Sequence, residues 1–240
     1  MGFTTFLNIF FIVPNTIINP ISAALTNPYR AIGIGSFVFF INSLQRAYLF
    51  RKEIFTDSKN KSLLKKMIPF SILGAFIGSL FISRLNTTLL SVVIIVTSLY
   101  FIYSTILILL VDNKNKNEGR IILGPIPVSI LTGLIQGVAL PGADIRAGYL
   151  RTKVSEVSVR AVSSFIGLFN FLILSTVLFI NHKMPTADIW FVISLIPALF
   201  LIQHIGKKIL VKIPDKYAKI LALTMSIVSL GVFIYSMFIK

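Results

Sequence analysis

Residues 137–153, GVALPGADIRAGYLRTK, place helix-breaking residues, a carboxylate and a guanidinium at the end of an apolar stretch. Pro141 removes a backbone donor and Gly142 permits backbone angles that other residues avoid, so a helix is expected to stop there and a short one to start near Ala143. The first amides of a helix are unpaired donors at its positive end, which makes them an anion site. Arg146, about one turn further on, would add a planar fork of donors matched to an oxyanion.

Gly142, Ala143, Asp144 and Arg146 are therefore predicted to form half of an anion-binding pocket. Ionisable groups inside a membrane are costly and usually functional. An alternative stays open, in which Asp144 and Arg146 pair with each other or with another helix only to make the break tolerable. Asp144 itself is expected either to relay a proton or to neutralise Arg146 when no substrate is bound.

The composition indicates the class of protein that must hold this site. Of the 240 residues, 55% are hydrophobic and 13% charged, and the mean hydropathy is +0.88, more apolar than one soluble core can bury. Bilayer crossings need about 20 apolar residues. Runs of about this length occupy 29–50, 67–83, 88–111, 158–181, 187–206 and 218–239. Two further segments, 2–28 and 121–150, are interrupted. We predict an all-α, multi-pass integral protein of the cell membrane, with eight hydrophobic segments: six full spans and two broken or re-entrant segments.

Several function classes are not expected from the same composition. The net charge of +15 comes from Lys and Arg in short loops between spans, as in membrane proteins, so no nucleic acid is predicted as a partner. The chain has no cysteine, two histidines and eight acidic residues, most of them in loops, which offers no metal site and no catalytic triad. We therefore expect no enzyme and no cofactor. No basic region precedes Arg30, so the N-terminus is expected to be retained rather than cleaved as a signal peptide.

One constant shift along the chain brings its two halves into register and predicts an internal duplication. The pairs are Ser36 with Ser164, Asn42 with Asn170, Pro69 with Pro197, and Gly78 with Gly206. The spacing that these pairs share is called the repeat offset below. The predicted repeats are 1–111 and 121–240, joined by a loop at 112–120.

The same shift lays residues 12–20, IVPNTIINP, over 140–148, so each half contains a broken segment at the same place. Interrupted segments in corresponding positions of two halves indicate a transporter binding site. Pro14 and Asn15 are predicted to complete the pocket from the first half.

Asn42, Asn170 and Ser164 are predicted to line the substrate path. For the asparagines and for Ser164, hydrogen bonding between helices is an equal alternative. Gln136 is expected to satisfy backbone groups freed by the break, and Arg46 to reach the interface from the end of its helix. Gly74 and Gly78 predict a close helix contact of the small-xxx-small type.

The distribution of positive charge favours re-entrant hairpins for the two broken segments. If all eight segments cross, Lys and Arg divide almost evenly between the two sides. With six crossing segments, 17 fall on one side, at 51–66, 114–120, 151–160 and 207–219, and 4 on the other. The positive-inside rule then gives three spans per half and an inverted repeat with both termini outside.

Certain residues resemble those of the TauE/SafE sulfite exporter family of membrane permeases. They are Gly133, Gly137 and Gly142 in GLIQGVALPGA, Ala161, Ser163 and Ser164 in VRAVSSF, and Pro14, Pro28, Ala31 and Ser36 in the first half. The resemblance implies proton-driven transport of sulfite, sulfonates or related sulfur or organic oxyanions. The expected partners are a small anion, the lipid bilayer and protons as coupling ion, with the oligomeric state left open. A passive anion channel or a structural membrane subunit of a larger complex is the alternative.

Overall fold

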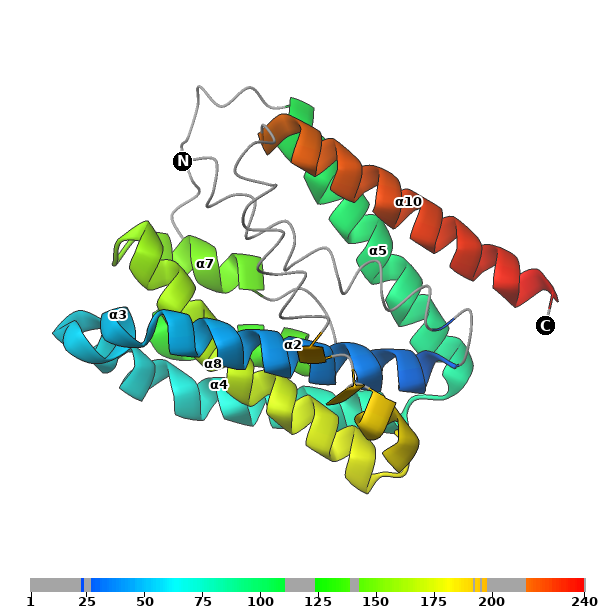
Figure 1. The fold of residues 1–240 in the computed structure, drawn as a ribbon, viewed down its shortest axis with the longest axis horizontal. Coiled ribbons are helices and arrows are strands. Elements are labelled where there is room, and N and C mark those ends of the chain that lie inside the picture. The colour runs from blue at the N-terminus through cyan, green and yellow to red at the C-terminus, as the bar shows by residue number, and fades with distance from the viewer. Residues whose placement is uncertain are drawn as a thin grey trace. The chain divides into compact units, whose positions relative to one another are not determined.

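The computed structural model describes residues 23, 27–110, 124–138, 143–191, 193–194, 196–197 and 215–239 (Figure 1). Among them the regular elements are all α-helices, which confirms the all-α prediction for this part of the chain. The named helices are α2 (Pro28–Leu49), α3 (Arg51–Thr56), α4 (Ser58–Arg84), α5 (Thr87–Leu110), α6 (Pro125–Gly137), α7 (Ala143–Arg151), α8 (Glu156–Ile180) and α10 (Asp215–Ile239). Residues 186–191 are also helical.

Helix starts follow the local sequence. Asp57 caps α4 by accepting a hydrogen bond from the backbone N of Lys59, and Ser155 caps α8 by accepting one from the backbone N of Ser158. Pro125 occupies the first position of α6, where the backbone N–H would have no partner within the helix, so its absence costs no hydrogen bond. These caps fix where α4, α6 and α8 begin, and so which residues face one another between them.

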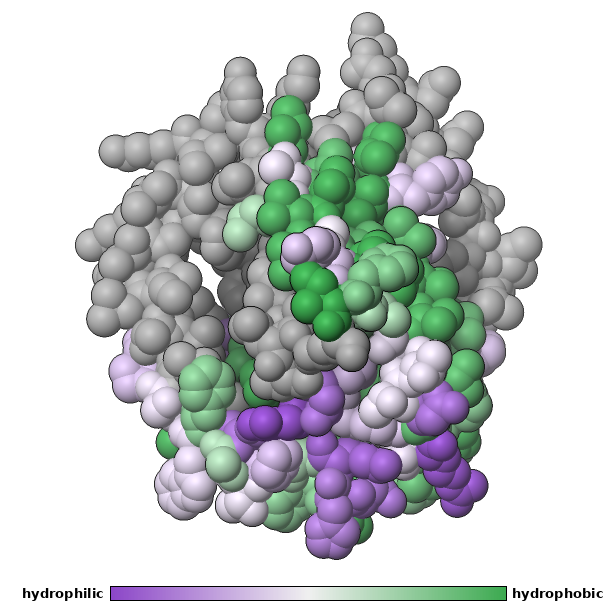
Figure 2. Space-filling view, turned by 90° about the vertical axis from the view of Figure 1, so that its right-hand side faces the viewer, coloured by the Kyte–Doolittle hydropathy of each residue, from purple (hydrophilic) through white to green (hydrophobic). Residues whose placement is uncertain are grey.

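Two of the described helices are long and apolar enough to cross a membrane, Ser58–Arg84 and Val157–Ile180. Shorter apolar stretches are Thr87–Tyr100 within α5, Pro125–Gly137, which is α6, and Leu223–Ile239 within α10. Large apolar side chains lie on the outside, as with Phe81 at 58% and Phe238 at 86% exposure. On the face shown in Figure 2, apolar residues form continuous areas of surface, as expected for contact with lipid.

The chain divides into two compact units, each built from separate stretches of sequence. Unit 1 contains Met1–Gly35, Asn86–Asn115 and Pro185–Lys240, and unit 2 contains Ser36–Leu85 and Lys116–Met184. Each unit therefore draws on both predicted repeats. Compactness does not test where the repeats begin and end, so their boundaries stay a prediction.

Within unit 2, α4 and α6 pack backbone against backbone through four glycines. A Cβ on Gly74 or Gly78 would come within 3 Å of α6 backbone, and one on Gly133 or Gly137 within 3 Å of α4 backbone. The predicted close contact at Gly74 and Gly78 is thus confirmed, with the GLIQG sequence of α6 as its partner. Small residues allow this approach because no side chain stands between the two backbones.

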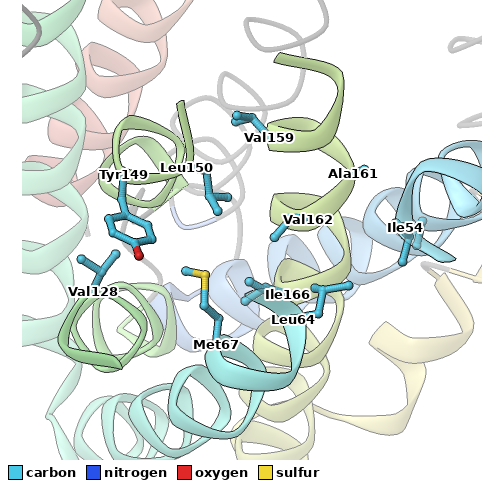
Figure 3. Packing of buried hydrophobic residues seen from close by; sticks show 11 residues of the cluster. Ile54, Leu64, Met67, Val128, Tyr149, Leu150, Val159, Ala161, Val162 and Ile166 are labelled. Carbon is cyan, nitrogen blue, oxygen red and sulfur yellow. The ribbon is translucent and has the colours of Figure 1, made fainter. Parts of the chain in front are cut away.

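A hydrophobic cluster joins α2, α3, α4, α6, α7 and α8 in the same unit. Figure 3 shows Met67, Val128, Leu150 and Ile166 pointing into the space between these helices. Met67, Leu150 and Ile166 are no more than 1% exposed. The short helix α7 is thereby fixed to its neighbours by apolar burial as well as by its polar contacts.

The predicted end of the first helix in this segment is confirmed, because α6 ends at Gly137 with Val138 as its C-cap, and α7 is described from Ala143 onward. The two helices then fold back on each other. Arg146 of α7 bonds to Gln136 near the end of α6, while Tyr149 near the end of α7 shares a cluster with Val128 near the start of α6. With 13 and 9 residues, each helix is shorter than the about 20 residues that cross a bilayer.

Helix bounds coincide at the offset of the predicted duplication. α2 begins at Pro28 and α8 begins at Glu156. These two starts are separated by the repeat offset, the same spacing as between Ser36 and Ser164. In unit 1, α10 packs along α5 (Figure 1). These bounds support the predicted duplication from an observation independent of residue matches.

The contacts between α2 and α8 in unit 2 run antiparallel. Ser36 shares a hydrogen bond of 2.9 Å with Ser175. The rings of Phe39 and Phe171 lie 5.2 Å apart, and a Cβ on Gly167 would lie 3.4 Å from Ser43 Oγ. Residue numbers rise along α2 as they fall along α8. The repeat offset pairs Phe39 with Gly167 and Ser43 with Phe171. Replacing both residues of the contact between Phe39 and Phe171 by their paired positions therefore gives the contact between Gly167 and Ser43, as a two-fold axis between inverted repeats requires.

A second pair of contacts is related by the same shift. In unit 1, Arg30 Nε donates to Asp188 Oδ2 at 2.9 Å and the two side chains form an ion pair. In unit 2, Asn60 Nδ2 donates to Ser158 Oγ at 3.0 Å. The repeat offset lays Arg30 on Ser158 and Asn60 on Asp188. The contact between Arg30 and Asp188 is therefore an ion pair, and the contact at the corresponding positions, Asn60 and Ser158, is a neutral hydrogen bond.

Candidate functional site

Arg146 is the most deeply buried cation among the described residues, with 1% of its surface exposed. Its Nη1 donates to Gln136 Oε1 at 3.0 Å, and its Nη2 donates to the backbone oxygen of Ser163 at 3.1 Å. Both of these acceptors are uncharged. The guanidinium is thus held between α6 and α8 in one orientation by bonds at two different nitrogens.

Gln136 connects Arg146 to a longer chain of buried hydrogen bonds. Its Oε1 also accepts from Asn170 Nδ2 at 2.6 Å, and the Asn170 amide exchanges hydrogen bonds of 2.9 and 3.1 Å with Ser71 Oγ. Arg146, Gln136, Asn170 and Ser71 come from four helices, and none is more than 3% exposed. We call these four residues the polar network. Networks of this kind fix side-chain geometry because every member restrains the next.

The glycine contact between α4 and α6 places this network. Gln136 lies between Gly133 and Gly137 in sequence, and a Cβ on Gly133 would meet the backbone oxygen of Ser71. The close approach of the two backbones therefore brings the Gln136 amide and the Ser71 hydroxyl within reach of the same Asn170 side chain. Local sequence and helix packing together determine where Arg146 finds its acceptor.

The arrangement is suited to binding an anion next to the helix break. A guanidinium presents five N–H donors in one plane, a geometry that matches oxyanions. Its burial strengthens the attraction of an incoming negative charge, because the interior screens charge less than water does. Among the described residues, no three acidic or histidine side chains gather as metal ligands.

Predicted site residues fall into four groups. Arg146 and Asn170 are brought together, joined through Gln136. Ala143 and Asp144 lie in the first turn of α7, the same helix as Arg146.

Ser164 is buried in α8 beside Ser163, whose carbonyl Arg146 contacts, and Asn42 is buried in α2 beside Ser43. Pro14, Asn15 and Gly142 lie outside the described residues, so their predicted part in the pocket stays a prediction.

Two residues of the site were not predicted from the sequence as site residues. Gln136 was expected to satisfy backbone groups, but its side-chain carbonyl accepts from Arg146 and Asn170. Ser71 precedes Gly74 and Gly78 on the helix stripe that contacts α6. The signal that could have found both is their position within the glycine contact motifs.

Helices of membrane length and large apolar side chains on the outside are features of an integral membrane protein. The family model described as Sulfite exporter TauE/SafE matches residues 15–233. The chain therefore belongs to the TauE/SafE sulfite exporter family, and the resemblance found in the sequence is confirmed. A search of curated proteins and a search of solved structures gave no match.

Proposed function

We propose that this protein carries a small sulfur or organic oxyanion, such as sulfite or a sulfonate, across the cell membrane, and that Arg146 binds the anion. The observation that carries the proposal is the buried Arg146 guanidinium, oriented by Gln136 and Ser163 next to the break between α6 and α7. A fixed, buried cation binds an anion without having to reorganise, so little of the binding free energy is lost in ordering the site.

In this proposal α6 and α7 form a re-entrant hairpin, with six full spans in the rest of the chain. Three observations support it: the shortness of both helices, their folding back, and the uneven distribution of Lys and Arg. Irregular backbone at membrane depth is tolerated where protein surrounds it, and the contacts of α7 with α6 and α8 supply such surroundings. The segment containing Pro14 and Asn15 would form the matching hairpin of the first repeat.

Transport would proceed by alternating access between the two repeats. The antiparallel contacts of α2 with α8 support the inverted relation on which such a mechanism depends. Asp144, two residues before Arg146 in α7, is the candidate for coupling to protons. A carboxyl group beside the bound anion can take up a proton as the anion leaves and so link the two movements.

Counterflow in proteoliposomes tests the proposal. Vesicles preloaded with sulfite, thiosulfate, sulfoacetate, sulfate or acetate would be challenged with a labelled trace of the same anion. A carrier shows saturable counterflow of at least one sulfur or organic oxyanion, and an imposed proton gradient drives its uptake. Conduction that does not saturate and that persists without a gradient would indicate a channel instead. Absence of movement for every anion would contradict the proposal.

A further inference from the structure

An open groove lies in unit 2 where α3, the first half of α4 and α8 meet. Five of its lining residues come from α4, two from α3 and one from α8. Its volume is about 410 Å³, within the about 300–1,000 Å³ typical of sites that bind small molecules. None of the four residues of the polar network lines it, so the groove is separate from the proposed anion site.

The inner side of the groove belongs to the core of the unit. Ile54 of α3 and Leu64 of α4 line it, and both are members of the hydrophobic cluster (Figure 3). On the outer side Phe55 is 56% exposed, and its ring lies edge-on to that of Phe165, with 5.9 Å between the centroids. The apolar surface of the groove is therefore formed by helices that are packed against one another.

Along α4 the lining of the groove changes from charged to apolar. Its five α4 residues follow a spacing of three and four, which places them on one face of the helix. Lys61 and Lys65 come first, and Ile68 and Pro69 follow one turn further into the membrane-length helix Ser58–Arg84. A phospholipid has the same order, with a polar headgroup at the membrane surface and apolar chains below it.

Lys61 and Lys65 give the groove a positively charged end. Both side chains are exposed, and neither forms an ion pair with a carboxylate of the described residues. Asp57, the acidic residue nearest to them in sequence, caps α4 by accepting from the backbone N of Lys59. Two ammonium groups one turn apart therefore attract a negatively charged headgroup to this end of the groove.

The predicted topology places this end of the groove next to anionic lipid. The lysines of 51–66 are among the 17 Lys and Arg residues that the six-span topology puts on one side, which the positive-inside rule makes the cytoplasmic side. Anionic lipids are concentrated in the cytoplasmic leaflet, where each Lys near the surface favours their binding. The charge of the groove thus complements the lipid that this leaflet supplies.

We propose that the groove binds an anionic phospholipid, with its phosphate at Lys61 and Lys65 and one acyl chain along Ile68 and Phe165. A free phosphate would leave the apolar part of the groove uncovered. A zwitterionic lipid carries a cation that the lysines repel. A bound anionic lipid contacts α3, α4 and α8 at once, and so stabilises their packing.

Quenching of a single tryptophan by brominated lipid tests the proposal in vesicles. Trp190 is the one tryptophan of the chain, so Phe55→Trp in a Trp190→Phe background puts the only tryptophan in the groove. Phe76→Trp in the same background is the matched control, since Phe76 is an exposed phenylalanine of α4 that does not line the groove. Brominated phosphatidylglycerol in phosphatidylcholine, and the reverse mixture, give the relative affinity for the two lipids.

We expect Phe55→Trp to report an affinity for phosphatidylglycerol at least about tenfold higher than for phosphatidylcholine, and Phe76→Trp to report no preference. Added to Phe55→Trp, Lys61→Gln and Lys65→Gln are each expected to lower the preference about fivefold. Lys66→Gln removes the same charge from an exposed position of α4 outside the groove. At about 0.15 M salt it should change the preference less than about twofold.

Equal quenching by the two lipids at Phe55→Trp, or the same preference at Phe76→Trp, would overturn the proposal. An unchanged preference in Lys61→Gln and Lys65→Gln would overturn the place of the headgroup. Relief of quenching by inorganic phosphate would show that the lysines bind a free anion instead of a lipid. Absence of quenching by either lipid at Phe55→Trp would show that another molecule or a protein segment fills the groove.

The melting temperature of wild type gives a second measurement that needs no variant. Ligands that bind the folded state raise the melting temperature according to their affinity. In detergent micelles we expect phosphatidylglycerol to raise it more than phosphatidylcholine with the same acyl chains does. Equal rises would overturn the proposal even if the tryptophan variants failed to fold.

Discussion

Gln136 shows how much of the site depends on a single uncharged atom. Its Oε1 accepts from Arg146 at 3.0 Å and from Asn170 at 2.6 Å, so it holds a cation and an amide at once. An acceptor with two lone pairs can serve both donors. The orientation of the Arg146 guanidinium is therefore set by a residue on a different helix.

Gln136→Met preserves the length and burial of the side chain but removes the acceptor. Leaving a buried donor without its acceptor costs about 1–3 kcal/mol. We expect a lower melting temperature and weaker anion binding. Asn181→Ala, which removes an exposed amide at the end of α8, should change the melting temperature much less. Equal effects of the two substitutions would show that the polar network contributes no more than a surface hydrogen bond.

Residue types predicted Arg146 and Asn170 as site residues but not Gln136 and Ser71. Arg146 stands out in the sequence because a guanidinium is rare in an apolar segment. Gln136 and Ser71 are ordinary residues, and their importance depends on packing that brings α4, α6 and α8 to one point. A list of polar residues could not distinguish them from the many serines that bond only to their own helix, such as Ser79 and Ser91.

At the scale of elements, the interlocking glycines of α4 and α6 place the polar network. A methyl group at Gly133 would meet the backbone of Ser71 and Ala75, whereas one at Gly231 in α10 would meet nothing within 4 Å. The two positions form a natural comparison, because both are helical glycines and differ in what surrounds them.

Gly133→Ala is expected to destabilise the protein by about 1–3 kcal/mol, since backbone contacts cannot move aside for the new methyl group. Gly231→Ala should leave stability unchanged or raise it by up to about 1 kcal/mol through helix propensity. Thermal unfolding in detergent measures both. A neutral Gly133→Ala variant would mean that α4 and α6 can separate without cost.

The hairpin of α6 and α7 gives a separate prediction for the side on which its two ends emerge. The chain has no cysteine, so single cysteines can be introduced at Asn117 and Thr152 and labelled with a membrane-impermeant reagent in oriented vesicles. We expect both to be labelled from the same side. Labelling from opposite sides would show that 121–150 crosses the membrane and would remove the re-entrant hairpin.

Sequence predicted the interruption of this segment but could not show its fold-back. Proline and glycine act locally, so the end of one helix and the start of the next follow from their positions. The angle between α6 and α7 depends on tertiary contacts, namely Arg146 with Gln136 and the cluster that holds Val128 and Tyr149. The positive-charge distribution indicated the fold-back only indirectly.

At the scale of the whole molecule, the predicted internal repeat relates contacts as well as sequence positions. The ion pair of Arg30 with Asp188 and the hydrogen bond of Asn60 with Ser158 occupy corresponding positions. Matches such as Asn42 with Asn170 predicted the repeat. The inversion of the repeats was predicted from charge alone, and the antiparallel contacts of α2 with α8 agree with that prediction.

The ion pair predicts an unequal response to the loss of each partner. The Asp188 side chain is 4% exposed and that of Arg30 is 37% exposed. Arg30→Gln leaves a buried carboxylate without its cation, while Asp188→Asn leaves a cation that can reach water. We expect Arg30→Gln to lower the melting temperature more, and the double substitution to recover part of the loss. Asp188→Asn being the more harmful change would contradict this description of the pair.

The most direct test of the central claim is sulfite counterflow in proteoliposomes containing wild type, Arg146→Gln or the exposed control Arg51→Gln. We expect exchange by wild type and by Arg51→Gln, and its loss in Arg146→Gln, with thermal unfolding and size-exclusion chromatography showing that all three proteins are folded. Exchange by Arg146→Gln at the wild-type rate would contradict a role of Arg146 in anion binding, and would leave the buried guanidinium as a structural support for the break between α6 and α7.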